Sequence, residues 1–423
     1  MWLRWAALAA LAAVSCVHAQ DRPPAPLSLD EALARVSDTH PALRLIEGER
    51  QVLQARGERA ALRPPLILGA QAENVLGSGQ ARGFDQAELT LSLSGVLERG
   101  GKLDARRALA QANLDALAPQ REAARLDLLA EVARRYQAIV VAQRQQALAL
   151  LDIDQRQRAV QAARTRLQAG ASPESVLFSA QAQLAQAELD RDRAAEAARA
   201  ARRHLATLWN AREPDFDTAT GDLDGLPELE AFDALAQWLQ RTPELAIVTG
   251  QARVREAQLR LAQGERATDL QWQLGVRRLQ GQQATALVAA LSLPLGNAVR
   301  AEPEIRAAQA ELALTTVQRE ALLLQLHATL AEAHGRYLTA RLEVQRLGRD
   351  VLPRLQQAEH AAERAWRAGA ISYLEWAQLQ GQRIQALQRQ LEAAAQAQTA
   401  LIELQRLTGQ PLVVPNPSQE TAP

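Results

Sequence analysis

A helical hairpin over residues 100–209 constrains this chain more than any other segment. Its return arm carries small apolar residues at alternating steps of three and four, broken once, by Arg191. The residues in this series are Leu177, Ala180, Leu184, Ala187, Ala194, Ala198, Ala201, Leu205 and Leu208. Such spacing is typical of coiled coils. Because alanine dominates the series, neighbouring backbones can approach closely, which favours several long helices packed side by side over one globular core.

The turn of this hairpin, residues 166–174, carries its own helix-ending signals. Gly170 can adopt the left-handed conformation that ends a helix. Ser172 can cap the next helix, and Pro173 suits its first position. The sequence therefore predicts a tight helix-turn-helix tip.

The hairpin occurs twice in the chain. Residues 131–136 reappear as 332–337, displaced by 201 residues, and the turn glycine Gly170 reappears as Gly369, displaced by 199. The segment at 32–43 also returns at 234–245. A period near 200 residues is far longer than the 20 to 50 of solenoid repeats. We interpret the chain as two duplicated halves.

Between helical segments the hydrophobic period changes to two. Leu89, Leu91 and Leu93 alternate with polar residues, and a similar alternation follows Leu270. Four strands are predicted, at 66–76, 87–97, 270–279 and 284–295, each with one apolar and one polar face.

These strands have the length of membrane-spanning strands, but four cannot close a barrel. Since lipid does not tolerate open sheet edges, several chains would have to share one barrel. The polar face suggests a wide, water-filled one; its residues are Gln71, Glu88, Thr90, Gln271 and Arg277. The alternative is a small soluble sheet with one solvated face, a common meaning of such alternation.

The predicted organisation follows from these patterns. Residues 1–19 read as a secretory signal with a small-residue cleavage site; the single cysteine, Cys16, leaves lipidation open as the alternative to cleavage after Ala19. The first repeat is 20–210, with a helix at 28–62 and the hairpin at 100–209. A linker at 211–228 leads to the second repeat at 229–410, with a helix at 229–264 and a hairpin at 298–408. Residues 411–423 are predicted to be a disordered tail.

The outgoing helices of both hairpins are predicted to be very long and uninterrupted. The first, at 101–168, would extend about 100 Å; the second runs over 301–368, with an apolar series from Leu323 to Val351. Helices of this length are unusual inside one soluble domain. Descending from a shared barrel, they would instead form a tube across the periplasm.

The chain resembles the TolC-like outer membrane efflux proteins, and within them the heavy-metal efflux branch. The resemblance rests on the ordered, duplicated motifs at 32–41 and 234–243, at 94–102, at 292–296, and at the two tips. It implies a mainly α fold with a small β part, a homotrimer with a shared 12-stranded barrel, and a coiled-coil periplasmic tunnel. The implied partners are a periplasmic adaptor protein, an inner-membrane pump of the RND type and outer-membrane lipid. The implied location is the outer membrane of a Gram-negative cell.

The resemblance also suggests site residues. Adaptor contacts would be made by the tips, at Arg166, Leu167, Gly170, Ala171, Ser172, Arg367, Gly369, Ala370, Ile371 and Ser372; ordinary helix-turn-helix signals are the alternative meaning. Glu359 and Glu363 occupy the neighbourhood where such tunnels narrow, although a solvated helix face would look the same.

No enzymatic or metal-binding chemistry is predicted. The formal net charge is zero, so a nucleic-acid partner is not indicated. His327 and His334 stand two helical turns apart, too far to share one ion. No zinc-protease, phosphate-loop or nucleophile-elbow motif occurs, and no cofactor is expected. Two hypotheses remain. One is a passive outer-membrane exit duct for heavy-metal cations, and the other is a secreted periplasmic coiled-coil structural or adaptor protein.

Overall fold

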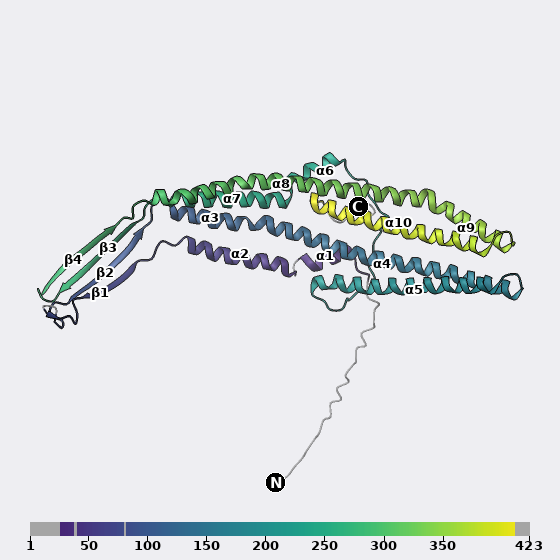
Figure 1. Ribbon diagram of the computed structural model, residues 1–423, viewed down its shortest axis with the longest axis horizontal. Helices are drawn as coiled ribbons and strands as arrows, with labels where there is room; N and C mark the ends of the chain where they lie inside the picture. The colour runs from purple at the N-terminus through teal and green to yellow at the C-terminus, as the bar shows by residue number, and fades with distance from the viewer. Residues whose placement is uncertain (1–25, 38–39, 80–81, 411–423) are drawn as a thin grey trace, which may run out of the picture.

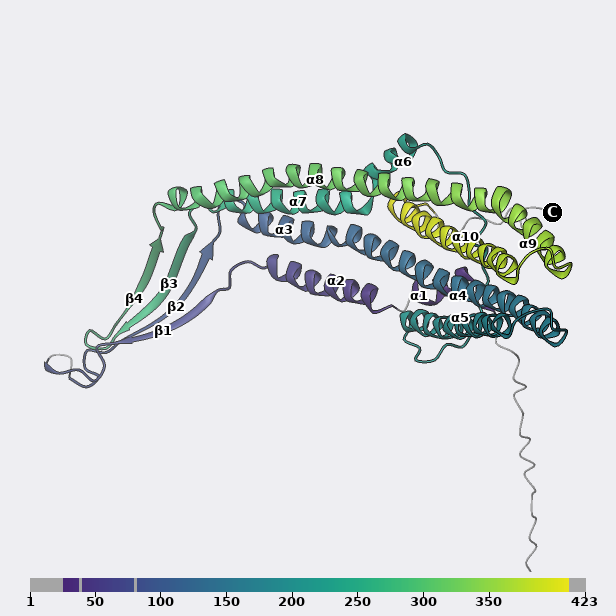
Figure 2. The same cartoon turned by 45° about the vertical axis from the view of Figure 1, so that its right-hand side comes forward.

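The computed structural model describes residues 26–37, 40–79 and 82–410. The predicted signal segment with Cys16 and the predicted tail at 411–423 lie outside these residues. Within them, the molecule is strongly elongated, with a β-sheet at one end and a long helical layer reaching to the other (Figures 1 and 2). Both helical hairpins turn at the end farthest from the sheet.

The first half begins with two helices, a β-hairpin and a helical hairpin. Its elements are α1 (Leu29–Ser37), α2 (Pro41–Ala60), β1 (Ile67–Glu73), β2 (Glu88–Leu97), α3 (Lys102–Asp115), α4 (Leu117–Gln168), α5 (Glu174–Ala206) and a 3₁₀ turn, η2 (Thr207–Trp209). Ser28 caps α1 by accepting a bond from the Glu31 N–H at 3.2 Å. Helix α1 ends at Ser37, and α2 begins at Pro41, with His40 as its N-cap residue.

The second half repeats this order. Its elements are α6 (Phe232–Trp238), η3 (Leu239–Arg241), α7 (Pro243–Gly264), β3 (Leu270–Leu279), β4 (Ala284–Ser292), α8 (Asn297–Arg346), a π-helical turn η4 (Leu347–Val351), α9 (Leu352–Arg367) and α10 (Tyr373–Thr408). Strands β1 and β4 occupy only part of the predicted ranges 66–76 and 284–295. The paired register of the sheet ends at Glu73 and at Ser292.

Two details of the helices differ from the sequence-based expectation. The segment 101–168 is not one continuous helix, because α3 ends at Asp115 and α4 begins at Leu117. Pro119 explains this break, since it has no N–H to offer the Asp115 carbonyl. The segment 301–368 is also divided, by the π turn that precedes Pro353. Pro303, six residues into α8, does not interrupt that helix.

The helices form four columns side by side. The α3–α4 column contacts α2 and α5 on one side and α7 and α10 on the other. The α8–α9 column then contacts α7 and α10 from beyond. The order across the layer is therefore α2 with α5, α3 with α4, α7 with α10, and α8 with α9. Among the described residues, no further long helix packs beyond the first or last column; only the short α6 and η3 also contact α8.

Two apolar cores hold the columns together at mid-height, one for each half. In the first, Tyr136 packs with Leu27, Phe216 and Leu223, and its hydroxyl donates to the Leu27 carbonyl at 2.8 Å. In the second, the Tyr337 hydroxyl donates to the Pro227 carbonyl. Burial raises the pKa of Tyr337 to about 12. The duplicated tyrosines thus fasten the connector between the halves onto both long helices.

The four strands form one antiparallel sheet in the order β1-β2-β3-β4. Each strand pairs only with its sequence neighbours, so β1 and β4 are both edges. Both the sheet and the helical layer are therefore four elements wide, and each has two open sides.

Candidate functional site

The two faces of the sheet separate apolar from polar side chains, which confirms the predicted alternation. Cross-strand pairing sets Leu91 beside Val276, and Val276 beside Leu287, on one face. The opposite face carries the row Gln71, Thr90 and Arg277, with Gln271 farther along. The polar residues named from the sequence therefore do share one side.

The apolar face of the sheet is uncovered in this chain. Leu287 is 88% exposed, and Leu68, Leu89, Leu91 and Leu274 are also exposed. The sheet projects beyond the helices, so none of the described helices packs on it (Figure 2). An apolar band of this extent indicates contact with lipid or another protein surface. A small soluble sheet buried on one side is not what the chain forms.

A charged cluster joins the sheet to the helices. The Lys102 ammonium, with its side chain only 4% exposed, lies 2.8 Å from an Asp269 carboxylate oxygen and 3.2 Å from one of Glu265. Arg106 pairs with Glu98 beside it. Burial would raise the pKa of Asp269, but bonds from Lys102 and the Arg99 N–H outweigh it and hold that pKa below its usual range. This cluster fixes how β2 and β3 leave the helical layer.

A large hollow runs along one face of the helical layer. Its volume is about 630 Å³, and its lining comes from all four columns, which indicates that the layer curves around this face. The lining is mostly polar and includes Glu49, Arg56, Gln120 and Gln318. Arg255 and Glu311, also in it, form an ion pair at 2.8 Å. These side chains would face any channel that the curved layer encloses.

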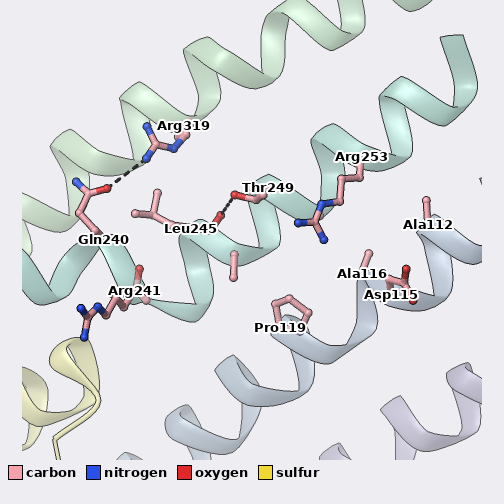
Figure 3. A pocket seen from close by; sticks show the side chains of 13 residues that line it. Ala112, Asp115, Ala116, Pro119, Gln240, Arg241, Leu245, Thr249, Arg253 and Arg319 are labelled. Carbon is pink, nitrogen blue, oxygen red and sulfur yellow. Dashed lines mark hydrogen bonds between the residues drawn. The ribbon is translucent and has the colours of Figure 1, made fainter.

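A second hollow, of about 310 Å³, lies where α7 and η3 meet α4 and α8 (Figure 3). Arg319 donates to Gln240 at 3.2 Å across it, and Arg253 and Asp115 approach from the other side. The hydroxyls of Thr242 and Thr249 donate to backbone carbonyls of their own segments. Both hydroxyls are therefore already engaged in hydrogen bonds within the helices.

The two hairpin tips lie side by side and are locked together by Arg166. Its guanidinium donates to the Trp366 carbonyl at 2.7 Å and lies 5.2 Å from the centre of a Trp366 ring. Trp366 stacks on Trp376 at 4.6 Å between ring centres, and Tyr373 packs edge-on against both. The first tip is therefore anchored to an aromatic cluster of the second.

The turn residues themselves are mostly exposed. Gly170 and Gly369 have φ of 69° and 80°, which confirms the predicted left-handed turns. Leu167, Ser172 and Ile371 are half-buried; the others are exposed, namely Ala171, Arg367, Ala370 and Ser372. The predicted capping role of Ser172 is wrong. Pro173 holds the N-cap position of α5 with no side-chain bond, because α5 starts one residue later than expected.

At the second tip, Ser372 does cap α10. Its hydroxyl accepts from the Glu375 N–H at 3.3 Å, while the Glu375 carboxylate accepts from the Ser372 N–H at 2.8 Å. This reciprocal capping box holds the start of α10 rigidly.

The two glutamates suggested for a narrowing differ in their surroundings. Glu359 is buried and pairs with Arg383 of α10 at 2.9 Å. Glu363 is partly exposed and pairs with Arg367, one turn nearer the tip. Of these two glutamates, only Glu363 has a side chain that is partly exposed to solvent.

Over residues 26–37, 40–79 and 82–410, no group of three or more His, Cys, Asp or Glu side chains is placed to hold a metal ion. In the same ranges, no helix combines the length and apolar character needed to cross a membrane.

The open edges of the helical layer carry exposed apolar residues. Along α8 they recur at helical spacing, at Leu314, Val317, Leu324, Leu338 and Leu342. On the opposite edge, Leu45 and Val52 of α2 and Phe178 and Leu189 of α5 are exposed. A monomer would leave both stripes in water, and exposed apolar stripes of this kind are typical of contact surfaces.

Sequence reasoning missed the aromatic cluster at the tips and the Lys102 cluster. A signal for the first was present, since aromatics make up 3% of the chain, yet Trp366, Tyr373 and Trp376 fall within eleven residues. No sequence signal pairs Lys102 with Asp269, because 167 residues separate them.

Known proteins resemble this chain in sequence and in fold. Residues 39–211 match the family described as outer membrane efflux protein. The cobalt-zinc-cadmium resistance protein CzcC of Cupriavidus metallidurans is 27% identical over 327 residues, covering 76% of this chain and 77% of that protein.

Solved structures share the fold at lower identity. The structure of CusC superposes with a TM-score of 0.78 at 17% identity, covering 90% of this chain and 91% of that one. A membrane protein from Pseudomonas aeruginosa gives 0.75 at 19% identity, covering 90% of each chain. The outer membrane protein VceC of Vibrio cholerae gives 0.72 at 18%, covering 91% of this chain and 97% of that one.

Proposed function

We propose that this chain is a TolC-like outer membrane efflux protein that works as the exit duct of a tripartite RND-type efflux system in a Gram-negative outer membrane. In this role it conducts substrate passively, and the inner-membrane pump supplies the energy. The single observation that carries the proposal is that the sheet and the helical layer are each four elements wide and open at both edges. The edge strand β1 lies on the same side of the molecule as the outer helices α2 and α5. The other edge strand, β4, lies on the side of the outer helices α8 and α9.

Closure requires further copies of the chain. An open sheet edge is not tolerated in lipid, so β4 of one copy must pair with β1 of the next. Because the two edges differ, the contact is head-to-tail and generates a ring. Two copies give eight strands and a filled interior, whereas three give twelve and leave room for water. The polar face of the sheet favours three.

Envelope fractionation of cells that express the full chain tests this assembly. We expect the protein in the outer-membrane fraction, as trimers that run as a slow band until boiled. Freely soluble periplasmic monomers would instead support the coiled-coil structural or adaptor protein, and would overturn the duct.

The tips are the proposed docking surface for the periplasmic adaptor, with Glu363 and Glu359 at the proposed narrowing. The exposed turns at Gly170 and Gly369 support this, because they lie together at the end farthest from the sheet (Figure 1). The buried ion pair of Glu359 with Arg383 favours Glu363 as the residue that faces the channel.

Replacing both turn glycines by leucine tests the docking role. A Cβ at Gly170 would meet open space, and one at Gly369 would come no nearer than 3.9 Å to the Arg166 guanidinium, so the substitutions cost backbone strain without a steric clash at Cβ. We therefore expect trimers to form while cross-linking to the adaptor and export are lost. Loss of trimers in the double variant would show that the glycines serve folding instead.

The proposed cargo is a heavy-metal cation, a proposal supported by the 27% identity to a cobalt-zinc-cadmium resistance protein. A deletion strain should become sensitive to zinc, cobalt or cadmium salts and regain resistance with the plasmid-borne gene. Sensitivity to hydrophobic drugs alone would assign the duct to a different pump.

A further inference from the structure

The polar face of the sheet carries its charge in two adjacent cross-strand rows, one with Glu73 and Glu88 and the next with Arg277. Following the register across the four strands, the ionisable side chains on this face of the described strands are Glu73, Glu88 and Arg277. The remaining positions on the face hold Gln, Ser, Thr, Gly or apolar residues, including Leu279 opposite Glu88. Glu73 ends β1, Glu88 begins β2, and Arg277 is two residues from the end of β3, so all three lie toward the turns of the hairpins. This end of the sheet is the one farthest from the helices (Figure 1).

The three side chains form one bonded group. Glu73 and Glu88 stand directly opposite each other on β1 and β2, an arrangement of like charges that destabilises a sheet when it is uncompensated. Arg277 of β3 bridges them, with its guanidinium 2.9 Å from a Glu88 oxygen and 3.2 Å from a Glu73 oxygen. Its Nε also donates to the Thr90 hydroxyl at 3.0 Å, and Thr90 is only 3% exposed. The guanidinium is therefore held in place from two strands.

One guanidinium cannot neutralise two carboxylates, so each chain keeps a net charge of −1 in these two rows. If three copies close the sheet, as the proposed function requires, the group repeats three times around the channel. The result is a ring of three arginines and six glutamates with a net charge of −3, at a mouth otherwise lined by uncharged strand residues. A low-dielectric wall focuses the field of such a ring into the channel.

We propose that this ring, Glu73, Glu88 and Arg277, is an electrostatic filter at the outer mouth of the duct, which favours cations, and that Arg277 sets its strength. The proposal rests on the proposed function, because it needs a closed, water-filled barrel. It assigns a selectivity element to the outer end of the duct, far from the hairpin tips.

The field of the ring can be measured locally with a cysteine at Gln71, an exposed residue in the same cross-strand row as Thr90 and Arg277. Purified trimers that carry Gln71→Cys are treated with a cationic and an anionic methanethiosulfonate reagent, and the ratio of the two labelling rates is recorded. The protein without this substitution is the blank. We expect the cationic reagent to react faster at about 0.1 M salt. The preference should fade at about 1 M, where the Debye length falls to about 3 Å.

Removing the arginine or removing the glutamates should shift the ratio of cationic to anionic labelling rates in opposite directions. Arg277→Gln makes the ring more negative and should raise the cationic preference at least about threefold, since such potentials reach several kT. The pair Glu73→Gln with Glu88→Gln leaves three arginines and should reverse the preference. If the ion pairs serve stability alone, both changes should lower the stability of the protein. They should not shift the ratio of labelling rates in opposite directions.

Two matched controls test whether the effect is confined to the polar face and to the turn end of the sheet. Arg278→Gln removes a charge from the neighbouring residue, which lies on the apolar face, and should leave the ratio unchanged. A probe at Gln273, four residues along β3 and about 14 Å away, should respond weakly, since the Debye length is about 10 Å at 0.1 M.

The outcomes separate the two proposals. If neither reagent labels the Gln71 position in folded trimers, the polar face is dry and the duct itself is excluded, together with the filter. If both reagents label it but the Arg277 and glutamate variants give equal ratios, the duct stands and the filter is overturned.

Discussion

At the scale of single residues, Gly100 shows how one position sets the angle between the sheet and the helices. Its φ is 74°, in the left-handed region. A Cβ there would lie 2.5 Å from the Ala267 Cβ and 2.7 Å from the Gly264 carbonyl oxygen. Two chain segments, one from each half, therefore meet at a point where only glycine fits. The adjacent Gly101 has a similar φ of 69° but faces open space.

This pair of glycines gives a matched test. Gly100→Ala should destabilise the protein by about 2–4 kcal/mol, since it combines backbone strain with a steric clash. Gly101→Ala should cost only about 1 kcal/mol, because strain acts there alone. Thermal melting of the helices, followed by circular dichroism, measures both. Equal losses for the two variants would mean that the close approach at Gly100 relaxes without cost.

The Lys102 cluster predicts a pH dependence. A bond from Arg106 holds the pKa of Glu98 below its usual range, and Asp269 is shifted in the same direction. A carboxylate with a lowered folded-state pKa stabilises the fold above its unfolded pKa of about 4, and that stability is lost as the pH falls through the folded pKa. The melting temperature should therefore drop below about pH 4.

Lys102→Met tests the source of this acid sensitivity. The variant should lose about 3–5 kcal/mol at neutral pH, because Asp269 remains partly buried without its cation, and its melting temperature should vary less between pH 3 and 7. Asp350→Asn is the control, since that carboxylate forms a surface ion pair with the exposed Arg346 and should contribute little. An unchanged acid slope in Lys102→Met would place the sensitivity elsewhere.

At the scale of elements, the two hairpins are not independent. Their alanine seams hold each hairpin together: in α5, Ala180, Ala187, Ala194 and Ala198 are all buried. At the tips, however, a shared apolar core couples the two hairpins, and Arg166 adds contacts to Trp366. One hydrogen bond and one cation–π contact are each worth about 1 kcal/mol.

Arg166→Ala should therefore loosen the tips locally. We expect backbone amides of α9 and α10 near the turn to exchange hydrogen about 5 to 30 times faster, as a loss of 1–2 kcal/mol implies. Amides near mid-height should be unaffected. Arg164→Ala, which removes an exposed arginine of the same helix, is the control. Faster exchange along the whole hairpin would indicate general destabilisation instead.

At the scale of the whole molecule, a single chain leaves both edges of its sheet and of its helical layer uncovered. The sheet leaves β1 and β4 unpaired, and the helical layer leaves an apolar stripe along α8. Leu324, on that stripe, is 74% exposed. Burying one leucine contributes about 1.5–3 kcal/mol, so several such residues repeated at each interface can hold a ring together.

Leu324→Arg should weaken assembly, because it places a charge where an apolar interface forms. We expect the heat-modifiable trimer band to be reduced or lost in unheated gels, while the helix content of the chain is kept. Leu150→Arg, at an exposed position on the interior column α4, should leave the trimer intact. Trimers of normal stability in Leu324→Arg would remove α8 from the interface.

The sequence by itself determined the elements and their order. Hydrophobic period, glycine turns and the duplication identify two long hairpins, two β-hairpins and the polar face with Gln71, Thr90 and Arg277, because these are local or periodic properties of the chain. It did not determine the break before Pro119 or the capping at Pro173, which depend on single backbone bonds at helix ends.

Only the tertiary structure decided which distant residues meet. Lys102 with Asp269, Arg166 with Trp366, and Arg277 with Glu73 and Glu88 are brought together by the packing of one half against the other. Many pairings of similar side chains satisfy the same sequence pattern, and only the packed backbone selects among them. The shared open sides of sheet and helices follow from that packing too, since an edge exists only once the neighbours of each element are fixed.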